Sequence, residues 1–322
     1  MKKITRTLCM IAVVALAFTS CKKTEDTQTV KFNAVTEQLV EEGFEKVYLD
    51  ANSNVVFEEN DIVCLFDITP DGSTSAPYYV CSEGYLKGYM GASIPENTNG
   101  YYYAFYPGAN VDASQLSAKN RATFELKAEQ NDTREGSTLK VPKDALYMAA
   151  KDDTHNALNN TFFNFKNICG ILSLKLYSTE LQSVRKIEIT DRHFNLVGKV
   201  SLNIPAVDPE YMTSLFDRYD ESNSTYMTEL LTYLNAEHLG YSVTDKSRTL
   251  TLDCGTTGVE LGRTKAKATR FFIVMRPLAL KEGCDIKIFF SDDPNDYYEI
   301  NSSKDNMIRP NVIKNMAAVK VG

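Results

Sequence analysis

Residues that could do chemistry are few and widely spaced in this chain of 322 residues. The 3 histidines, His155, His193 and His238, lack the close spacings that ligands of one metal ion usually have. The sequence contains no GxGxxG, GxxxxGK[ST], GxSxG or HExxH motif, so the common signatures of nucleotide binding, hydrolysis and metalloproteolysis are missing. We therefore expect a protein that is not an enzyme and that holds neither a metal ion nor another cofactor.

The acidic run from Asp292 to Asp296 could offer oxygen ligands to Ca²⁺, which prefers carboxylate oxygens. It lies between two strand-like segments, and it contains Pro294 and Asn295, which favour tight turns. We predict a hairpin turn here rather than a metal site.

The aromatic segment from Tyr101 to Tyr106 has two interpretations. Exposed tyrosines such as Tyr102, together with Tyr78, could stack on sugar rings and bind a glycan. Successive side chains of a strand, however, face opposite sides, so some of these rings would enter the core while others cover the outer face. A glycan-binding surface is therefore the alternative function.

Beyond the first 21 residues the cysteines are Cys64, Cys81, Cys169, Cys254 and Cys284, with no CxxC pair among them. Most lie inside apolar, strand-like patterns, so we predict small buried side chains rather than reactive thiols. A disulfide between Cys64 and Cys81 on neighbouring strands stays open, because the sequence does not fix their geometry.

The composition limits both the fold and the partners. The chain has 35 Lys+Arg against 42 Asp+Glu and a net charge of −7, without the basic face that nucleic acids require. It contains 18 Tyr and 16 Phe but no Trp, and 43% of its residues are apolar. This usage favours a folded, β-rich protein that does not bind nucleic acid.

Strand-length apolar or alternating runs, separated by turn residues, recur along the whole chain. This spacing predicts an all-β protein built from antiparallel sandwiches. The runs lie at 55–57, 62–66, 78–81, 101–106, 162–165, 171–176, 187–189, 196–202, 249–252, 271–275, 286–290, 297–300 and 317–321.

Two further features concern domain organisation. The polar residues from Tyr177 to Ser183 suggest a boundary, which gives an N-terminal domain at 31–178 and a C-terminal domain at 179–322. Apolar residues at helical spacing predict a short helical insertion at 225–237 in the second domain, which either packs on the sandwich or docks a partner. They are Met227, Leu230, Leu231 and Leu234.

The N-terminus has the layout of an export signal. A basic start is followed by an apolar run from Leu8 to Phe18 that is too short to span a bilayer, so residues 1–20 are predicted to be a signal peptide. The stretch ending in Ser20-Cys21 resembles a bacterial lipobox, with Phe18 where Leu is usual. This resemblance implies cleavage between Ser20 and Cys21, lipidation of Cys21, a tether at 21–30 and attachment to the cell outer membrane.

Several segments, in order, resemble the fimbrillin family, the pilus-subunit lipoproteins of Bacteroides-type bacteria. Phe32-Asn33-Ala34 resembles the opening strand of that family, and 57–63 resembles its "W..GD.I" segment. The segment 102–107 is similar to the family's "YYAYYP" strand. The pair 146–150 and 163–170 is similar to its "LMA…F.FKH" pattern.

The fimbrillin resemblance implies two tandem transthyretin-like β-sandwich domains, export to the surface or fimbrium, and assembly with other pilus subunits by strand exchange. A supplied strand adds main-chain hydrogen bonds and buried side chains to an open sheet edge. The closing segment 306–321 is either the donor or edge strand, or simply a terminal strand of its own domain. Its candidate residues are Ile308, Val312, Ile313, Met316, Val319 and Val321.

The chain departs from the family at the protease site. In that family a protease removes the first strand after a basic residue, usually Arg, but no arginine occurs between Cys21 and Arg121. Lys31 or Lys46 would have to replace it. We therefore predict an anchor, accessory or tip subunit that keeps its lipid, rather than a cleaved stem subunit, with a host or glycan ligand as a further partner.

Overall fold

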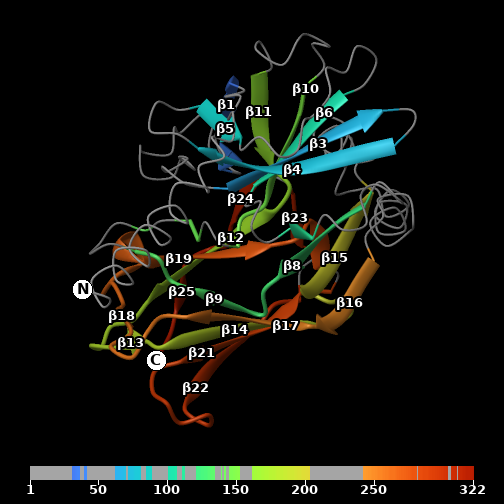
Figure 1. Cartoon of the computed structure of the whole chain (residues 1–322). Helices are drawn as coiled ribbons and strands as arrows, with labels where there is room; N and C mark the ends of the chain where they lie inside the picture. Colours follow the sequence, from blue (N-terminus) through green and yellow to red (C-terminus); the bar gives the residue numbers. More distant parts are fainter. Residues whose placement is uncertain are drawn as a thin grey trace, which may run out of the picture.

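The structure of the chain is a computed structural model, and it is almost entirely β (Figure 1). The described exception is a 3-10 turn at Lys265–Lys267. The all-β prediction is therefore confirmed, whereas the helix predicted at 225–237 lies outside the described residues. The residues that the structure describes are 31–36, 40–41, 62–69, 72–80, 85–88, 101–106, 111–112, 121–134, 139, 141–142, 145–152, 162–203, 242–280, 282–303, 306–309 and 311–322.

The upper part of the molecule in Figure 1 is a closed barrel. Ala104, Phe105 and Tyr106 are buried in succession, so both faces of their strand are covered there. The side chains of Tyr101–Tyr103 lie outside the described residues, as do those of Tyr78 and Cys64. The barrel strands, in order of neighbours, are β1 (Lys31–Thr36), β11 (Phe162–Asn167), β10 (Met148–Asp152), β6 (Tyr101–Tyr106), β3 (Ile62–Thr69), β4 (Gly72–Val80) and β5 (Tyr85–Gly88).

The lower part consists of two larger sheets that share a core. The first sheet contains β19 (Thr269–Met275), β12 (Gly170–Tyr177), β24 (Val312–Asn315) and β2 (Val40–Glu41), with β25 (Val319–Lys320) also paired to β12. The second contains β22 (Tyr297–Asn301), β21 (Cys284–Phe289), β14 (Lys186–Asp191), β17 (Thr249–Asp253) and β9 (Glu129–Asn131).

Smaller sheets complete the described fold. A 4-stranded sheet contains β16 (Ser242–Ser247), β15 (Val197–Asn203), β8 (Arg121–Leu126) and β7 (Val111–Asp112). Two 2-stranded sheets pair β13 (Ser183–Val184) with β18 (Val259–Glu260) and β20 (Leu278–Leu280) with β23 (Asn306–Ile308).

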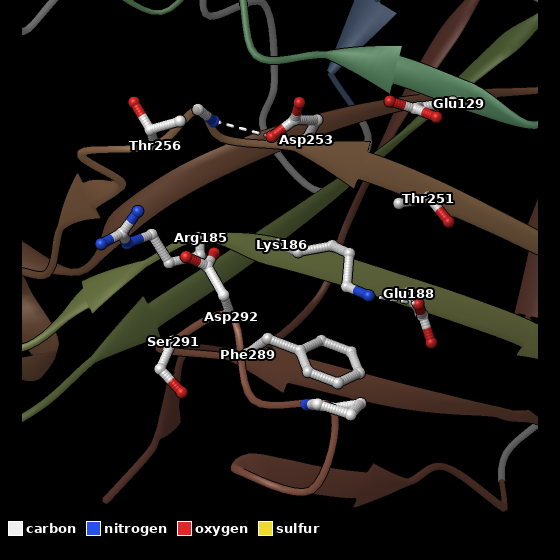
Figure 2. Close-up of a pocket in the computed structure, with 12 residues that line it drawn as sticks. Glu129, Arg185, Lys186, Glu188, Thr251, Asp253, Thr256, Phe289, Ser291 and Asp292 are labelled. Carbon is white, nitrogen blue, oxygen red and sulfur yellow. Dashed lines mark hydrogen bonds and ion pairs between the residues drawn. The ribbon is translucent and has the colours of Figure 1, made fainter.

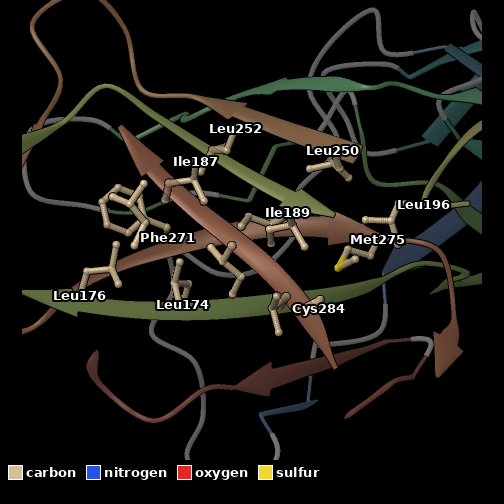
Figure 3. Close-up of a cluster of buried hydrophobic side chains, with 14 of the residues drawn as sticks. Leu174, Leu176, Ile187, Ile189, Leu196, Leu250, Leu252, Phe271, Met275 and Cys284 are labelled. Atoms are coloured by element: carbon tan, nitrogen blue, oxygen red, sulfur yellow. The ribbon is translucent and has the colours of Figure 1, made fainter. Parts of the chain in front are cut away.

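Alternation of apolar and polar residues builds the core between the two larger sheets (Figure 3). Along β17, Leu250 and Leu252 are buried while their neighbours are half-buried, as expected for a strand with one face inward. Ile187 and Ile189 of β14 repeat the pattern, and Phe271 of β19 faces them from the other sheet. Each such side chain stabilises the fold by about 1.5–3 kcal/mol through its burial.

The prediction of purely antiparallel sheets is wrong in one respect. Adjacent segments do form antiparallel hairpins, such as β3 with β4 and β21 with β22. Segments far apart in the sequence, however, pair in parallel, and local alternation does not record such partners. The parallel pairs are β1 with β11, β2 with β24, β9 with β17, and β12 with both β24 and β25.

Strand pairing crosses the predicted domain boundary. β8 and β9 precede residue 178 in the sequence, yet they pair with β15 and β17, which follow it. β2 likewise pairs with β24 near the C-terminus. The division into 31–178 and 179–322 stays a prediction.

Candidate functional site: strand edges and an outer trough

The first strand, β1, lies at the seam of the barrel. On one side it pairs in parallel with β11, where Asn33 to Thr36 lie opposite Phe162 to Phe165. On the other side it pairs antiparallel with β5, where Phe32 lies opposite Leu86. Without β1, the edges of β5 and β11 would lose this partner.

The candidate donor segment, 306–321, is part of the chain's own sheets. β24 lies between β12 and β2, with Ile313 opposite Ile171, and β25 continues along β12. Ile308, Ile313 and Val321 are buried. The remaining candidates, Val312, Met316 and Val319, are half-buried.

Hydrogen bonds hold this segment along β12. The Asn311 backbone N–H donates to the Cys169 carbonyl at 3.0 Å, and the Asn167 side-chain amide donates to the Asn311 Oδ1 atom at 2.7 Å. Asn311 has a backbone φ of 58°, in the left-handed region where asparagine is among the more tolerant residues. Further along, the Val321 N–H donates to the Tyr177 carbonyl at 2.9 Å.

One short stretch near the N-terminus serves both parts of the molecule. β1 completes the barrel, and β2, which begins four positions after β1 ends, covers the outer edge of β24 at Val312 and Ile313. Loss of residues 31–41 would therefore expose barrel edges and part of the edge of β24 together.

The opposite edge of that sheet, at β19, is closed by side chains rather than by a strand. Gln130 is buried, and its amide makes both bonds that a neighbouring strand would make to Val274. The Val274 N–H donates to Gln130 Oε1 at 3.0 Å, and Gln130 Nε2 donates to the Val274 carbonyl at 2.7 Å.

Arg134 caps the same edge at Arg270, four residues from Val274 along β19. Its Nη2 atom donates to the Arg270 carbonyl at 2.9 Å. The guanidinium also binds both carboxylate oxygens of Asp132, each at 2.7 Å, and lies 5.0 Å from the centre of the Phe271 ring. Neither Gln130, in the short strand β9, nor Arg134, which follows that strand, is predicted from the sequence, since single polar residues have no periodic signal.

An open trough of about 560 Å³ lies on the outer face of β14, β17 and β21 (Figure 2). Two of its charged groups form an ion pair, and a third accepts a backbone hydrogen bond. Lys186 Nζ lies 2.8 Å from Glu188 Oε1 and 4.1 Å from the centre of the Phe289 ring, and Asp253 Oδ1 accepts the Gly255 N–H at 2.8 Å. We assign no ligand to this trough.

The described cysteines are structural. Cys169, Cys254 and Cys284 are buried and unbridged, which confirms the prediction for these three. Burial raises the pKa of each thiol to about 12, so the nucleophilic thiolate is scarce at neutral pH. Cys81 lies outside the described residues, so a bridge to Cys64 stays an open prediction.

Asp191, at the end of β14, is a fully buried carboxylate. Its Oδ1 atom accepts the backbone N–H groups of His193 and Phe194, and so fixes the turn that leaves the strand. Its Oδ2 atom has no hydrogen-bond partner among the residues that the structure describes. Burial raises the pKa of this carboxyl above its usual value, and the two backbone N–H bonds oppose that shift.

The acidic run at 292–296 forms the predicted hairpin turn between β21 and β22. The Asp296 N–H donates to the Asp293 carbonyl at 3.1 Å, and the Asn295 N–H donates to Asp293 Oδ1 at 2.9 Å. Within the described part of the chain, no group of three or more His, Cys, Asp or Glu residues could hold a metal ion. The same residues include no helix with the length and apolar character needed to cross a membrane.

The predicted lipidation and cleavage residues, Ser20 and Cys21, lie outside the described residues. No protein-family model matches the chain, and no curated protein matches it either.

Solved structures give distant similarities. A candidate cell adhesion protein from Bacteroides ovatus has a TM-score of 0.48 and 10% identity over 88% of each chain. A second, from Bacteroides uniformis, has a TM-score of 0.46 and 12% identity over 90% of this chain and 94% of that one. A fimbrial protein from Bacteroides ovatus has a TM-score of 0.41 and 10% identity over 92% of this chain and 50% of that one. At this level the comparisons assign no family to the chain.

Proposed function

We propose that this chain is a non-enzymatic, cell-surface lipoprotein of the fimbrillin type, which anchors or joins a pilus by donating a strand. The position of β1 is the observation that supports this role most directly. Because β1 already fills the seam between β5 and β11, the barrel offers no groove to an incoming strand while β1 is present. A chain that keeps its first strand is then a donor rather than an acceptor at this site.

The donor would be the segment 306–321. On its outer side, β24 is covered within the described chain only by Val40 and Glu41. The segment therefore pairs with β12 through β24 and β25, with the short strand β2 through β24, and with β20 through β23. Release would expose Ile308, Ile313 and Val321, at a cost of about 1.5–3 kcal/mol each. Burial of the same side chains in a groove of the next subunit offsets that cost.

The two candidate processing sites have different consequences. Cleavage after Lys31 would leave every residue of β1 that pairs with β11 in place, since that register starts at Asn33. Cleavage after Lys46 would remove both β1 and β2. Only the second would open the barrel and produce an acceptor, as in a stem subunit.

A reversible lock tests the donor role without removing apolar core residues. Ser173 of β12 lies opposite Asn315 of β24, so Ser173→Cys with Asn315→Cys would tie the donor segment to its own sheet. We expect the oxidised variant to lose the large assemblies that contain this chain in outer-membrane fractions, and to regain them on reduction. Native gel electrophoresis with an antibody to the chain measures this.

A second cysteine pair controls for the bridge itself. Thr190 and Thr249 face each other across β14 and β17, with their hydroxyl oxygens 2.9 Å apart, and neither belongs to the donor segment. Thr190→Cys with Thr249→Cys should leave assembly intact. Equal assembly by both oxidised variants would overturn the donor role.

The intact mass of the native protein tests the anchor role separately. A mature chain that starts at an acylated Cys21 supports an anchor with β1 retained. A chain that starts after Lys46 would instead identify an acceptor subunit and contradict our proposal.

Glycan binding through Tyr78 and Tyr102 remains the alternative prediction. Both residues lie on barrel strands, β4 and β6. Loss of polysaccharide binding in Tyr102→Ala would support it, and absence of binding across a glycan panel would remove it.

A further inference from the structure

The second sheet of the lower part ends at β22, which lies at the lower margin of the molecule in Figure 1. All of its residues except Ile300 are exposed, and Ile300 is half-buried. Among the described strands, β22 pairs only with β21. Within the described chain its other side is therefore an unpaired edge, whereas side chains cap the edge at β19.

The alternation of hydrogen bonds between β21 and β22 shows which backbone groups of β22 face away from β21. The Ser302 N–H donates to the Cys284 carbonyl at 2.9 Å, which makes this a bonded pair of the antiparallel ladder. Bonded pairs alternate with non-bonded ones, so the backbone N–H and C=O groups of Tyr297, Glu299 and Asn301 face away from β21. An added strand would find donors and acceptors at every second residue.

The core beside this edge is incompletely covered. Tyr298 lies opposite Ile288, and Ile300 lies opposite Ile286, so both side chains are on the core face of the sheet. Ile286 and Ile288 are fully buried, whereas Tyr298 keeps 37% of its surface exposed. A further strand would bury Tyr298 and Ile300 with the rest of the core.

Charge distinguishes the strands that could dock here. Glu299 lies on the outer face at the centre of the edge, and Asp292, Asp293 and Asp296 lie in the turn that precedes β22. Antiparallel pairing of two copies around Glu299 would place like charges opposite each other, which is destabilising. A partner strand with a basic residue at that position would gain instead.

We propose that the edge of β22 binds an extended segment of another protein, which carries Lys or Arg opposite Glu299 and apolar residues on either side of it. The basic residue would share the outer face with Glu299, and its two neighbours would cover Tyr298 and Ile300. This site is separate from β1 and from the segment 306–321, so it goes beyond the proposed donor function and does not depend on it.

Two labelled peptides test this edge by fluorescence anisotropy: Thr-Ile-Lys-Val-Thr and its counterpart with Glu in place of Lys. We expect the lysine peptide to bind the full chain more tightly than the glutamate peptide. Glu299→Pro removes an outward N–H but no bond to β21. It should weaken the binding of the lysine peptide about tenfold or more. Glu299→Lys should reverse the preference, by up to about fivefold for one cross-strand charge pair.

Glu129→Lys, which changes an exposed acidic residue at the other end of the same sheet, is the matched control and should leave the preference unchanged. Circular dichroism checks that each variant is folded, and if Glu299→Pro is not, the reversal in Glu299→Lys decides. The proposal is overturned if neither peptide binds, or if the preference survives Glu299→Lys. It is equally overturned if the chain forms a dimer through this edge, which would identify a second copy as the occupant.

Discussion

The edge strands β19 and β22 lie beside the same hydrophobic core, but their outward backbone groups differ in whether side chains bind them. At β19 the outward groups of Val274 and Arg270 are bonded by the side chains of Gln130 and Arg134. At β22 the outward groups of Tyr297, Glu299 and Asn301 have no such cap within the described chain, and the adjacent Tyr298 is partly exposed. Side chains from a distant segment can thus satisfy outward backbone groups of a sheet edge that a strand would otherwise pair.

This difference bears on whether each edge could pair with a strand of another protein. An unpaired edge is a template for unwanted pairing, and proteins usually cover it or place charges on it. The β19 edge is capped at Val274 and at Arg270, and these bonds stabilise the fold. The β22 edge has one charge, Glu299, near its centre and no proline, which restricts its partners without excluding them.

The largest effect on this comparison is expected from Gln130→Leu. The substitution leaves a buried N–H and a buried C=O of Val274 without partners, which should lower the free energy of unfolding by about 2–4 kcal/mol. Urea unfolding measures the change. Glu129→Gln, at the exposed neighbouring position, is the control and should be close to neutral; if both variants are equally stable, the amide does not cap β19.

A smaller effect is expected from Arg134→Met. It removes one bond to the Arg270 carbonyl and leaves the nearly buried carboxylate of Asp132 without its guanidinium, at a cost of about 1–3 kcal/mol. Arg263→Met removes a comparable bond to the Thr179 carbonyl at an exposed site and should cost less than about 0.5 kcal/mol. If the two variants lose the same free energy of unfolding, Arg134 stabilises the fold no more than an exposed arginine does.

The smallest effect is expected on the pH dependence of stability, through Asp191 of β14, which lies in the same sheet as β22. The folded-state pKa of Asp191 is raised by burial, so the folded protein binds this proton more readily than the unfolded chain does. Stability from this group therefore increases as the pH falls from neutrality through the folded pKa, until the unfolded carboxyl also protonates near its ordinary value of 3.8. Asp191→Asn should lack this increase while keeping the Oδ1 bonds; parallel pH profiles of unfolding would contradict the assignment.

The sequence predicts the members of the sheets better than their neighbours. The alternation of Leu250 and Leu252 locates β17 and its buried face, because a period of two is a local property. The parallel partner of that strand, β9, is only Glu129–Asn131 and comes from more than a hundred residues away. A pairing of that kind depends on the assembled core, so local patterns do not record it.

The candidate site divides in the same way. The apolar residues of the segment 306–321 are evident in the sequence, and three of them are indeed buried. The sequence does not show which strand each of them pairs with. It also does not show that residues 31–41 contribute one strand to the barrel and another to the edge of β24. The edge at β22 was predicted as a strand, but its position at the end of a sheet follows only from the order of the strands.

The parallel pairing of β2 with β24 and of β24 with β12 also determines how the molecule would respond to mechanical force. If the chain is held at its N-terminal side and pulled at its C-terminus, β2 and β24 are drawn in opposite directions along their length. The hydrogen bonds between them are then sheared together rather than opened one after another. Force applied in this direction would therefore meet the combined resistance of these hydrogen bonds.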